Sequence, residues 1–225
     1  MAKAKRRTTK SAVKKTWIPI IAPALFNKQT LGETPVVESS KSIGKTVPVT
    51  LSNLTRDMRQ QNISVIFEIT NLSSNKFFSE LIGFEMAAAS VKRMVRRGKR
   101  KVDYSFEVKT ADDYKLRLKV IMITIGLTNL SSLTRLKKAC KEEIDKYFAK
   151  NSYDRFAAEL VGHRVQGTMK KILNKTYPLR LFEVRYMKVL KKPSAEKKKV
   201  VKEEAKPEEK PAEVKPAVKE APKKE

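Results

Sequence analysis

Alternating residues in the middle of the chain predict a β-hairpin. Apolar and polar positions alternate over residues 102–108 and again over 114–120, with the period of two that one buried face of a strand produces. The turn residues Thr110 to Asp113 separate the two runs. The polar positions of the second run are all cations, so the exposed face of the hairpin is predicted to be largely basic. Residues 121–125 are mostly apolar on both faces, which indicates that this strand continues into the interior.

Shorter apolar runs predict further strands on both sides of the hairpin. They cover residues 36–37, 47–51, 63–69, 76–84 and 177–190. Pro48 cannot donate a ladder hydrogen bond, so the second of these is an edge strand or a strand start. In the last run, strict alternation places one set of residues opposite another: Leu179, Leu181, Glu183, Arg185 and Met187 against Arg180, Phe182, Val184, Tyr186 and Lys188.

Helical spacing of apolar residues predicts helices mainly after the hairpin. They cover residues 86–97, 133–148, 153–160 and 165–173, with a short turn beginning at Ser52. Strands first, helices second and a last strand indicate an α+β fold. We expect a mostly antiparallel sheet that curls into a barrel-like domain, with the helices packed on it.

The composition changes near both ends of the chain. Residues 191–225 hold 12 Lys, 8 Glu and 5 Pro but no aromatic residue, Leu or Ile, so this segment cannot bury enough apolar surface to fold and is predicted to be disordered. Residues 1–16 carry seven cations and no acid. The predicted organisation is an extended basic arm at 1–27, a single α+β RNA-binding body at 28–190 and a tail at 191–225.

The charge balance narrows the classes of function. The chain of 225 residues has 50 Lys+Arg against 24 Asp+Glu, a net charge of +26, and this favours a polyanionic partner. One Cys and one His cannot form an intrachain disulfide or supply the ligands of a typical zinc site. We therefore expect no metal, no cofactor and a cytoplasmic location. The Ile18–Phe26 run contains Pro19 and Pro23, which argues against a secretory signal, and no membrane segment is expected.

Candidate catalytic residues have simpler interpretations. Gly44-Lys45-Thr46 resembles the end of a phosphate-binding loop, but Ser39 stands where that motif needs glycine and a strand follows. Asp112 and Asp113 suit the hairpin turn, and Glu142 and Glu143 suit ion pairs on a helix. His163 follows Gly162 at a helix junction, where capping or RNA contact is expected, and Cys140 lies on an apolar helix face.

Basic residues cluster between the first predicted helix and the hairpin. Six cations fall within nine residues and almost no acid accompanies them: Arg93, Arg96, Arg97, Lys99, Arg100 and Lys101. Together with the hairpin cations they could form one contiguous patch. Such an imbalance indicates phosphate binding without sequence readout.

Three separated stretches, in the same order, resemble one known family. They are Lys14–Asn27, the hairpin Phe106–Leu118, and Tyr177–Leu179 followed by Val184-Arg185 and Leu190–Pro193. Together they resemble the archaeal and eukaryotic small-subunit ribosomal protein family called S-one-e or S-three-a-e, and the short arm and Lys/Glu/Pro tail look archaeal. Asp113 stands where the family commonly has glycine, which concerns the type of turn.

The resemblance implies a structural role without catalysis. It places the protein on the platform of the small subunit near the mRNA exit site, in contact with ribosomal RNA and neighbouring ribosomal proteins, with mRNA as a further candidate partner. Phe26 would anchor the arm. The expected RNA-binding residues are Lys14, Lys15, Trp17, Lys28, Arg93, Arg96, Arg97, Lys99, Arg100, Lys101, Lys109, Lys115, Arg117, Lys119, Lys191 and Lys192.

Two other functions share parts of this evidence. A free nucleic-acid-binding protein, such as a chromatin or RNA chaperone factor, has the same composition. A metal-dependent nuclease would use the acids near the hairpin, and Asp112→Asn would then abolish a magnesium-dependent cleavage.

Overall fold

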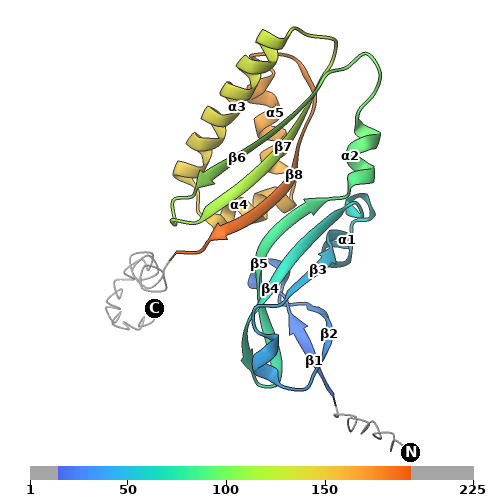
Figure 1. Ribbon diagram of the computed structural model, residues 1–225, viewed down its shortest axis with the longest axis vertical. Helices are drawn as coiled ribbons and strands as arrows, with labels where there is room; N and C mark the ends of the chain where they lie inside the picture. Colours follow the sequence, from blue (N-terminus) through green and yellow to red (C-terminus); the bar gives the residue numbers. More distant parts are fainter. Residues whose placement is uncertain (1–14, 194–225) are drawn as a thin grey trace, which may run out of the picture. The chain divides into compact units, whose positions relative to one another are not determined.

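The computed structural model describes residues 15–193, and it has the expected α+β architecture (Figure 1). The first part of the predicted arm and nearly all of the predicted tail lie outside the described residues. The strands are β1 (Thr16–Ile21), β2 (Thr30–Val36), β3 (Thr46–Thr50), β4 (Ile63–Ser73), β5 (Lys76–Met86), β6 (Lys101–Lys109), β7 (Lys115–Thr124) and β8 (Leu179–Lys191). The α-helices are α1 (Leu51–Thr55), α2 (Ala88–Met94), α3 (Leu130–Lys150), α4 (Tyr153–Val161) and α5 (Arg164–Leu173). Single 3-10 turns are η1 (Ala24–Phe26), η2 (Ser39–Ser42) and η3 (Met58–Gln60).

The eight strands form one mostly antiparallel sheet. Its main path runs β2-β1-β5-β8-β7-β6, while β3 pairs with β4 and β4 with β5. The mostly antiparallel sheet is confirmed, and its path begins at β2 and ends at β6, so it is not closed into a barrel. Strand β3, which contains Pro48, pairs with β4 alone among the described strands and is the edge strand that the sequence predicts.

The segment after the basic residues belongs to the sheet. Strand β1 pairs antiparallel with β2 and also runs parallel to β5, where Ile20 and Ile21 lie beside Phe77 and Phe78. The sequence analysis does not predict β2 before its last residue. The boundary predicted at residue 27 falls between two paired strands.

The predicted hairpin is confirmed as β6 and β7. Its register runs from Lys101 opposite Ile123 to Lys109 opposite Lys115, without interruption. Asp113 in the turn has a φ of 61°, in the left-handed region where glycine is favoured. This conformation fits the glycine expected there from the family resemblance.

Strict alternation in the last strand is wrong. Val120 pairs with Val184 and Lys119 with Tyr186, so a bulge at Arg185 shifts the register. Met187 therefore lies on the same buried face as Val184, although the alternation placed the two on opposite faces. A second bulge separates Lys191 from Val189 in their pairing with β7.

The helices pack on the sheet and build the main core. Buried residues of α3, α4 and α5, including Phe148, Phe156 and Met169, cluster with Leu118 of β7 and Phe182 of β8. The predicted helix at 86–97 is shorter than expected, because β5 continues to Met86 and α2 ends at Met94. Within residues 15–193, no helix is long and apolar enough to cross a membrane.

Candidate nucleic-acid interface

One face of the β6–β7–β8 sheet carries a set of cations in register. Lys109, Lys115 and Lys191 stand side by side across the three strands, and Arg117 pairs with Lys188 on the next row. Lys119 follows, opposite Tyr186. We call this set the basic face: Lys109, Lys115, Arg117, Lys119, Lys188 and Lys191. The apolar residues that alternate with these cations on β7 are buried in the main core with α3 and α5, so the helices cover the opposite side of the strands.

Glu107 lies among the six cations and holds two of them, and Glu85 of β5 stands opposite Tyr186 at the border of the face. Glu107 binds Lys115 and Arg117 at 2.6 Å each. Hydrogen bonds from Lys115, which has the larger effect, and from Arg117 hold the pKa of Glu107 below its usual value. Because like charges stand next to one another on the strands, this carboxylate reduces their mutual repulsion. Arg117 and Lys115 are thereby oriented across the face.

Lys109, Lys188 and Lys191 are exposed and form no ion pair with any residue from 15 to 193. Lys119 lies 4.8 Å from the ring centroid of Tyr186, a cation–π contact that fixes its ammonium group above the strand. The face therefore combines oriented and free cations. The free ones are the groups available to phosphates.

The second predicted cluster lies over the same side of the sheet. Val91 of α2 packs with Ile121 and Ile123, which project from β7 on the face that carries Arg117 and Lys119. The cations after α2 lead to Arg100 and Lys101, which lie beside Thr124 and Ile123 at the end of the hairpin remote from its turn, so Ile121 and Ile123 separate them from the basic face. Arg93 donates to the Asn62 side chain at 2.8 Å, and Lys101 pairs with Asp103 at 2.6 Å. Arg96, Arg97 and Arg100 are exposed, while Lys99 is half-buried.

The remaining predicted contacts are dispersed. Lys15 and Lys28 are exposed, Trp17 on β1 is 63% exposed, and Lys14 lies outside the described residues. Phe26 is buried with its ring edge against Phe67, which supports the expected anchor. None of them belongs to the basic face.

Lys192 has a structural partner. Its ammonium group bonds Glu68 at 2.6 Å and Glu80 at 3.1 Å, two acids that stand opposite one another on β4 and β5. Partial burial lowers the pKa of Lys192, but the bonds to Glu68 and Glu80 outweigh this, so its pKa is raised. Lys192 therefore ties the end of β8 to the β4–β5 pair.

Sequence reasoning missed Lys188 as a member of the basic face. The alternation in the last strand breaks at Arg185, so the face to which Lys188 belongs could not be read from its position. Tyr186 and Lys188 are two residues apart and therefore share one face of β8, the face that lies opposite Lys119 and Arg117. This spacing was the available signal.

The acids near the hairpin have structural roles. Asp112 accepts a hydrogen bond from the backbone N–H of Tyr153 at 2.8 Å, which is the first residue of α4. This helix start receives no bond from the side chain of its own cap residue, Ser152. Asp112 thus caps α4 from the hairpin turn. Among residues 15–193, no group of three or more His, Cys, Asp or Glu side chains could hold a metal ion.

Replacing Asp112 by alanine is expected to lower the free energy of unfolding by about 1 kcal/mol, because the helix loses its cap. Asp112→Asn keeps an amide oxygen there and should stay near the native stability. Urea unfolding followed by circular dichroism measures both. Asp145→Ala, an exposed acid on α3, is the control, and an equal loss in this variant would contradict the capping role.

His163 and Cys140 lie where the sequence predicts them, without catalytic surroundings. His163 is the N-cap residue of α5, as the expected capping position requires, with a φ of 55°, but its side chain makes no capping hydrogen bond. Its Nδ1 lies 3.8 Å from Glu183 Oε2. Burial lowers the pKa of His163, partly offset by Asp57. Cys140 is fully buried, and burial raises its thiol pKa to about 12, which makes it unreactive.

Comparison with known proteins identifies a family. The model of the Ribosomal S3Ae family matches residues 3–193. The small ribosomal subunit protein eS1 of Saccharolobus islandicus is 33% identical over 179 residues, covering 80% of this chain and 86% of that protein. The protein of the same name from Desulfurococcus amylolyticus is 30% identical over 182 residues, covering 81% and 85%. On this match over most of its length, the chain belongs to the Ribosomal S3Ae family.

Proposed function

We propose that the chain is a structural component of the small ribosomal subunit that holds ribosomal RNA by phosphate contacts. The observation that carries the proposal is the basic face, with six cations in register across three strands and Glu107 bound to two of them. Guanidinium and ammonium groups at the spacing of neighbouring strands can bind successive phosphates of one RNA strand. The family relatives, which bear the name of a small-subunit protein, support the ribosome as its cytoplasmic location.

The finer parts of the proposal rest on the family resemblance. They are a position on the platform near the mRNA exit site, contacts with neighbouring ribosomal proteins and with mRNA, and a role without catalysis. The capping role of Asp112 supports a role without catalysis, because the carboxylate that a nuclease would use for catalysis instead caps α4.

Three alanine substitutions in the basic face should weaken RNA binding. Lys109, Lys188 and Lys191 are exposed and free of ion pairs, so their joint replacement removes phosphate contacts without leaving a described carboxylate unpaired. We expect affinity for deproteinised small-subunit ribosomal RNA to fall on the order of 30-fold. The slope of log affinity against log salt should become shallower by about 3.

The matched control removes three exposed lysines from α3. Lys138, Lys141 and Lys150 are also exposed, but they lie on a helix that packs against the other side of the sheet. If this control lost as much affinity as the basic-face variant, RNA binding would follow total charge and not this surface.

Residence on the ribosome is tested separately by sucrose-gradient sedimentation of a native lysate at low and high salt, with magnesium constant. We expect about one copy per small subunit to persist in high salt. Movement into the light fractions would favour the free nucleic-acid-binding protein instead, since simple phosphate binding weakens steeply with salt.

A further inference from the structure

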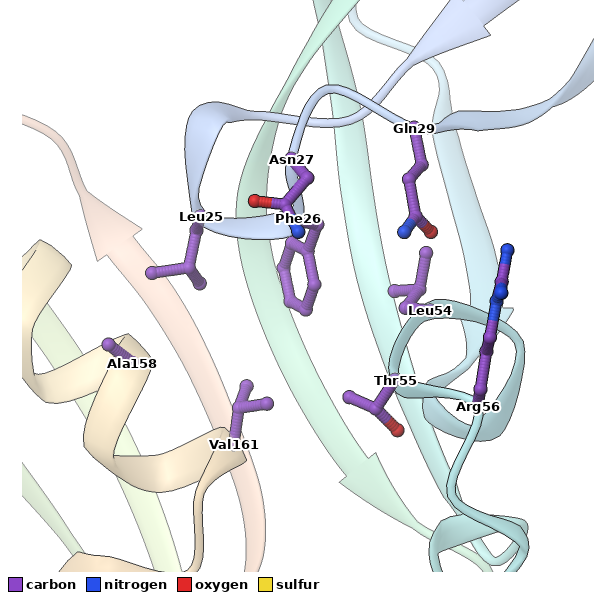
Figure 2. Close-up of a pocket in the computed structure, with 9 residues that line it drawn as sticks. All are labelled: Leu25, Phe26, Asn27, Gln29, Leu54, Thr55, Arg56, Ala158 and Val161. Atoms are coloured by element: carbon purple, nitrogen blue, oxygen red, sulfur yellow. The ribbon is translucent and has the colours of Figure 1, made fainter.

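A pocket of about 370 Å³ lies apart from the basic face, where three connections meet (Figure 2). Its walls come from the turn between β1 and β2, the end of α1, and α4. Leu25, Phe26 and Val161 supply apolar surface, and Asn27, Gln29 and Arg56 supply polar groups. The volume falls within the range of small-ligand sites, about 300–1,000 Å³.

Three polar side chains of this pocket have no partner among the described residues, whereas the fourth, Thr55, bonds Leu51 O and Gln60 Oε1 within the fold. The side-chain amides of Asn27 and Gln29 make no hydrogen bond with any residue from 15 to 193, and within the same range Arg56 forms no ion pair. Figure 2 shows Leu25 and Val161 on one side, and Thr55 and Arg56 on the other. Apolar walls with a few convergent and unoccupied hydrogen-bonding groups are typical of a ligand site.

Unusual backbone conformations place two of these side chains. Asn27 has a φ of 55° and Arg56 a φ of 59°, and each closes a short helical turn through its backbone N–H, to Ala24 O and Ser52 O respectively. Left-handed backbone is uncommon for residues other than glycine, and it is enriched at binding sites. Lys28, next to Asn27, has a φ of 52° and an exposed side chain.

We propose that this pocket binds one unpaired nucleobase of ribosomal RNA, a proposal that rests on the function proposed above. The planar guanidinium of Arg56 stacks on the base, and the amides of Asn27 and Gln29 bond its polar edge. Lys28, an exposed residue next to Asn27 in the sequence, binds the flanking phosphate. The basic face holds the RNA backbone, whereas the pocket selects an unstacked base.

The chemistry around the pocket favours RNA over a peptide. Arg56 is a cation, and none of the described residues that line the pocket is an acid. Lys28 and Arg59 nearby are exposed cations, and the two acids next to lining residues, Asp57 and Glu159, are half-buried and already bonded to the Arg59 backbone N–H and to Arg155. A polyanion is attracted to the cations Lys28, Arg56 and Arg59, and unstacked bases of RNA can stack on an arginine plane.

The first test changes the shape of the cation and keeps its charge. Arg56→Lys in the full chain is compared with Arg59→Lys, a nearby exposed arginine that does not line the pocket. The probes are a uridine octamer, an adenosine octamer and an abasic ribose-phosphate octamer, each followed by fluorescence anisotropy. We expect Arg56→Lys to lose about tenfold in affinity for at least one base-containing octamer. The Arg59 variant should lose little, and the two should be equal on the abasic octamer.

A second variant fills the pocket from an exposed helix position. Ala158→Trp places a large side chain at the α4 wall, and Ala149→Trp does the same at an exposed position of α3 away from the pocket. The first should reproduce the loss of Arg56→Lys on the base-containing octamer, and the second should not. Equal behaviour of both pairs of variants on every probe overturns the base pocket.

A photo-crosslinking amino acid at Leu25, in full chain assembled into small subunits, identifies the occupant. An adduct with ribosomal RNA is expected, and an adduct with a ribosomal protein overturns the proposal in favour of a peptide site. The basic-face variant of Lys109, Lys188 and Lys191 distinguishes failure of the proposed function from failure of the base pocket. If it weakens RNA binding while the pocket variants do not, the function stands and only the pocket is wrong.

Discussion

Replacing Tyr153 by alanine is expected to lower the free energy of unfolding by about 4 kcal/mol, the typical cost of removing a buried aromatic side chain. Tyr153 is buried at the start of α4, and its hydroxyl donates to the carbonyl of Leu81 in β5 at 2.9 Å. Its ring stacks on Tyr114 with 4.8 Å between centroids, and its backbone N–H is the one that Asp112 binds. One residue thus joins a helix, the hairpin turn and the strand β5.

The conservative variant separates packing from hydrogen bonding. Tyr153→Phe keeps the ring and loses only the bond to Leu81, for an expected cost of about 1–2 kcal/mol. Urea unfolding by circular dichroism measures both variants. If alanine cost no more than phenylalanine, the ring would not be part of the packing that holds α4 to the sheet.

Glu183→Gln is expected to stabilise the protein at alkaline pH by about 3 kcal/mol. The side chain of Glu183 on β8 is only 15% exposed, and its Oε2 accepts no hydrogen bond from any residue in 15–193. Burial raises its pKa to about 7, and Lys170 offsets this only in part. The Nδ1 atom of His163 lies 3.8 Å from its Oε2.

The sign follows from proton uptake. The pKa of Glu183 rises from 4.5 to about 7 on folding, so between these values the folded chain keeps a proton that the unfolded chain has released. The contribution of Glu183 to the free energy of unfolding is fully present below pH 4.5. It falls by about 1.4 kcal/mol per pH unit as the pH rises to about 7. Glutamine stays neutral at every pH, so the free energy of unfolding of the variant does not fall for this reason.

The measurement is the difference in unfolding free energy between Glu183→Gln and the native chain, from pH 4.5 to 8.5 at constant ionic strength. It should be near zero at the acid end and largest above pH 7. His163 is common to both proteins, so its own titration largely cancels. A variant less stable than the native chain at pH 8 would mean that the carboxylate is charged and paired in the folded state.

Local patterns predicted the parts of the fold that depend on neighbours in the sequence. The β6–β7 hairpin is confirmed because its alternation, its turn residues and its register all lie within a short stretch. Helices α3, α4 and α5 are confirmed for the same reason. The pairing of β1 with β2 and with β5 was missed, because its Pro19 and its basic flank conceal a strand and the parallel contact joins distant segments.

The candidate site was predictable to the same degree. The cations of β7 were found because they alternate with core residues, whereas Lys188 required knowledge of the bulge at Arg185. The carboxylate bound by Lys115 and Arg117 depends on the hairpin register, which brings Glu107 opposite Arg117. The pocket unites three distant segments, so no sequence pattern could have indicated it.

The position of β5 in the sheet has a consequence for synthesis. This strand pairs with β4 and β1, which precede it, and at Gly83 to Glu85 with β8, the last strand of the chain. At Gly83 the backbones are so close that an added Cβ would lie 3.3 Å from the carbonyl oxygen of Met187, and glycine permits this approach. During translation the edge of β5 stays without its partner until the end of the body leaves the exit tunnel. The nascent protein therefore passes through a long interval with an open strand edge, and unpaired strand edges promote aggregation.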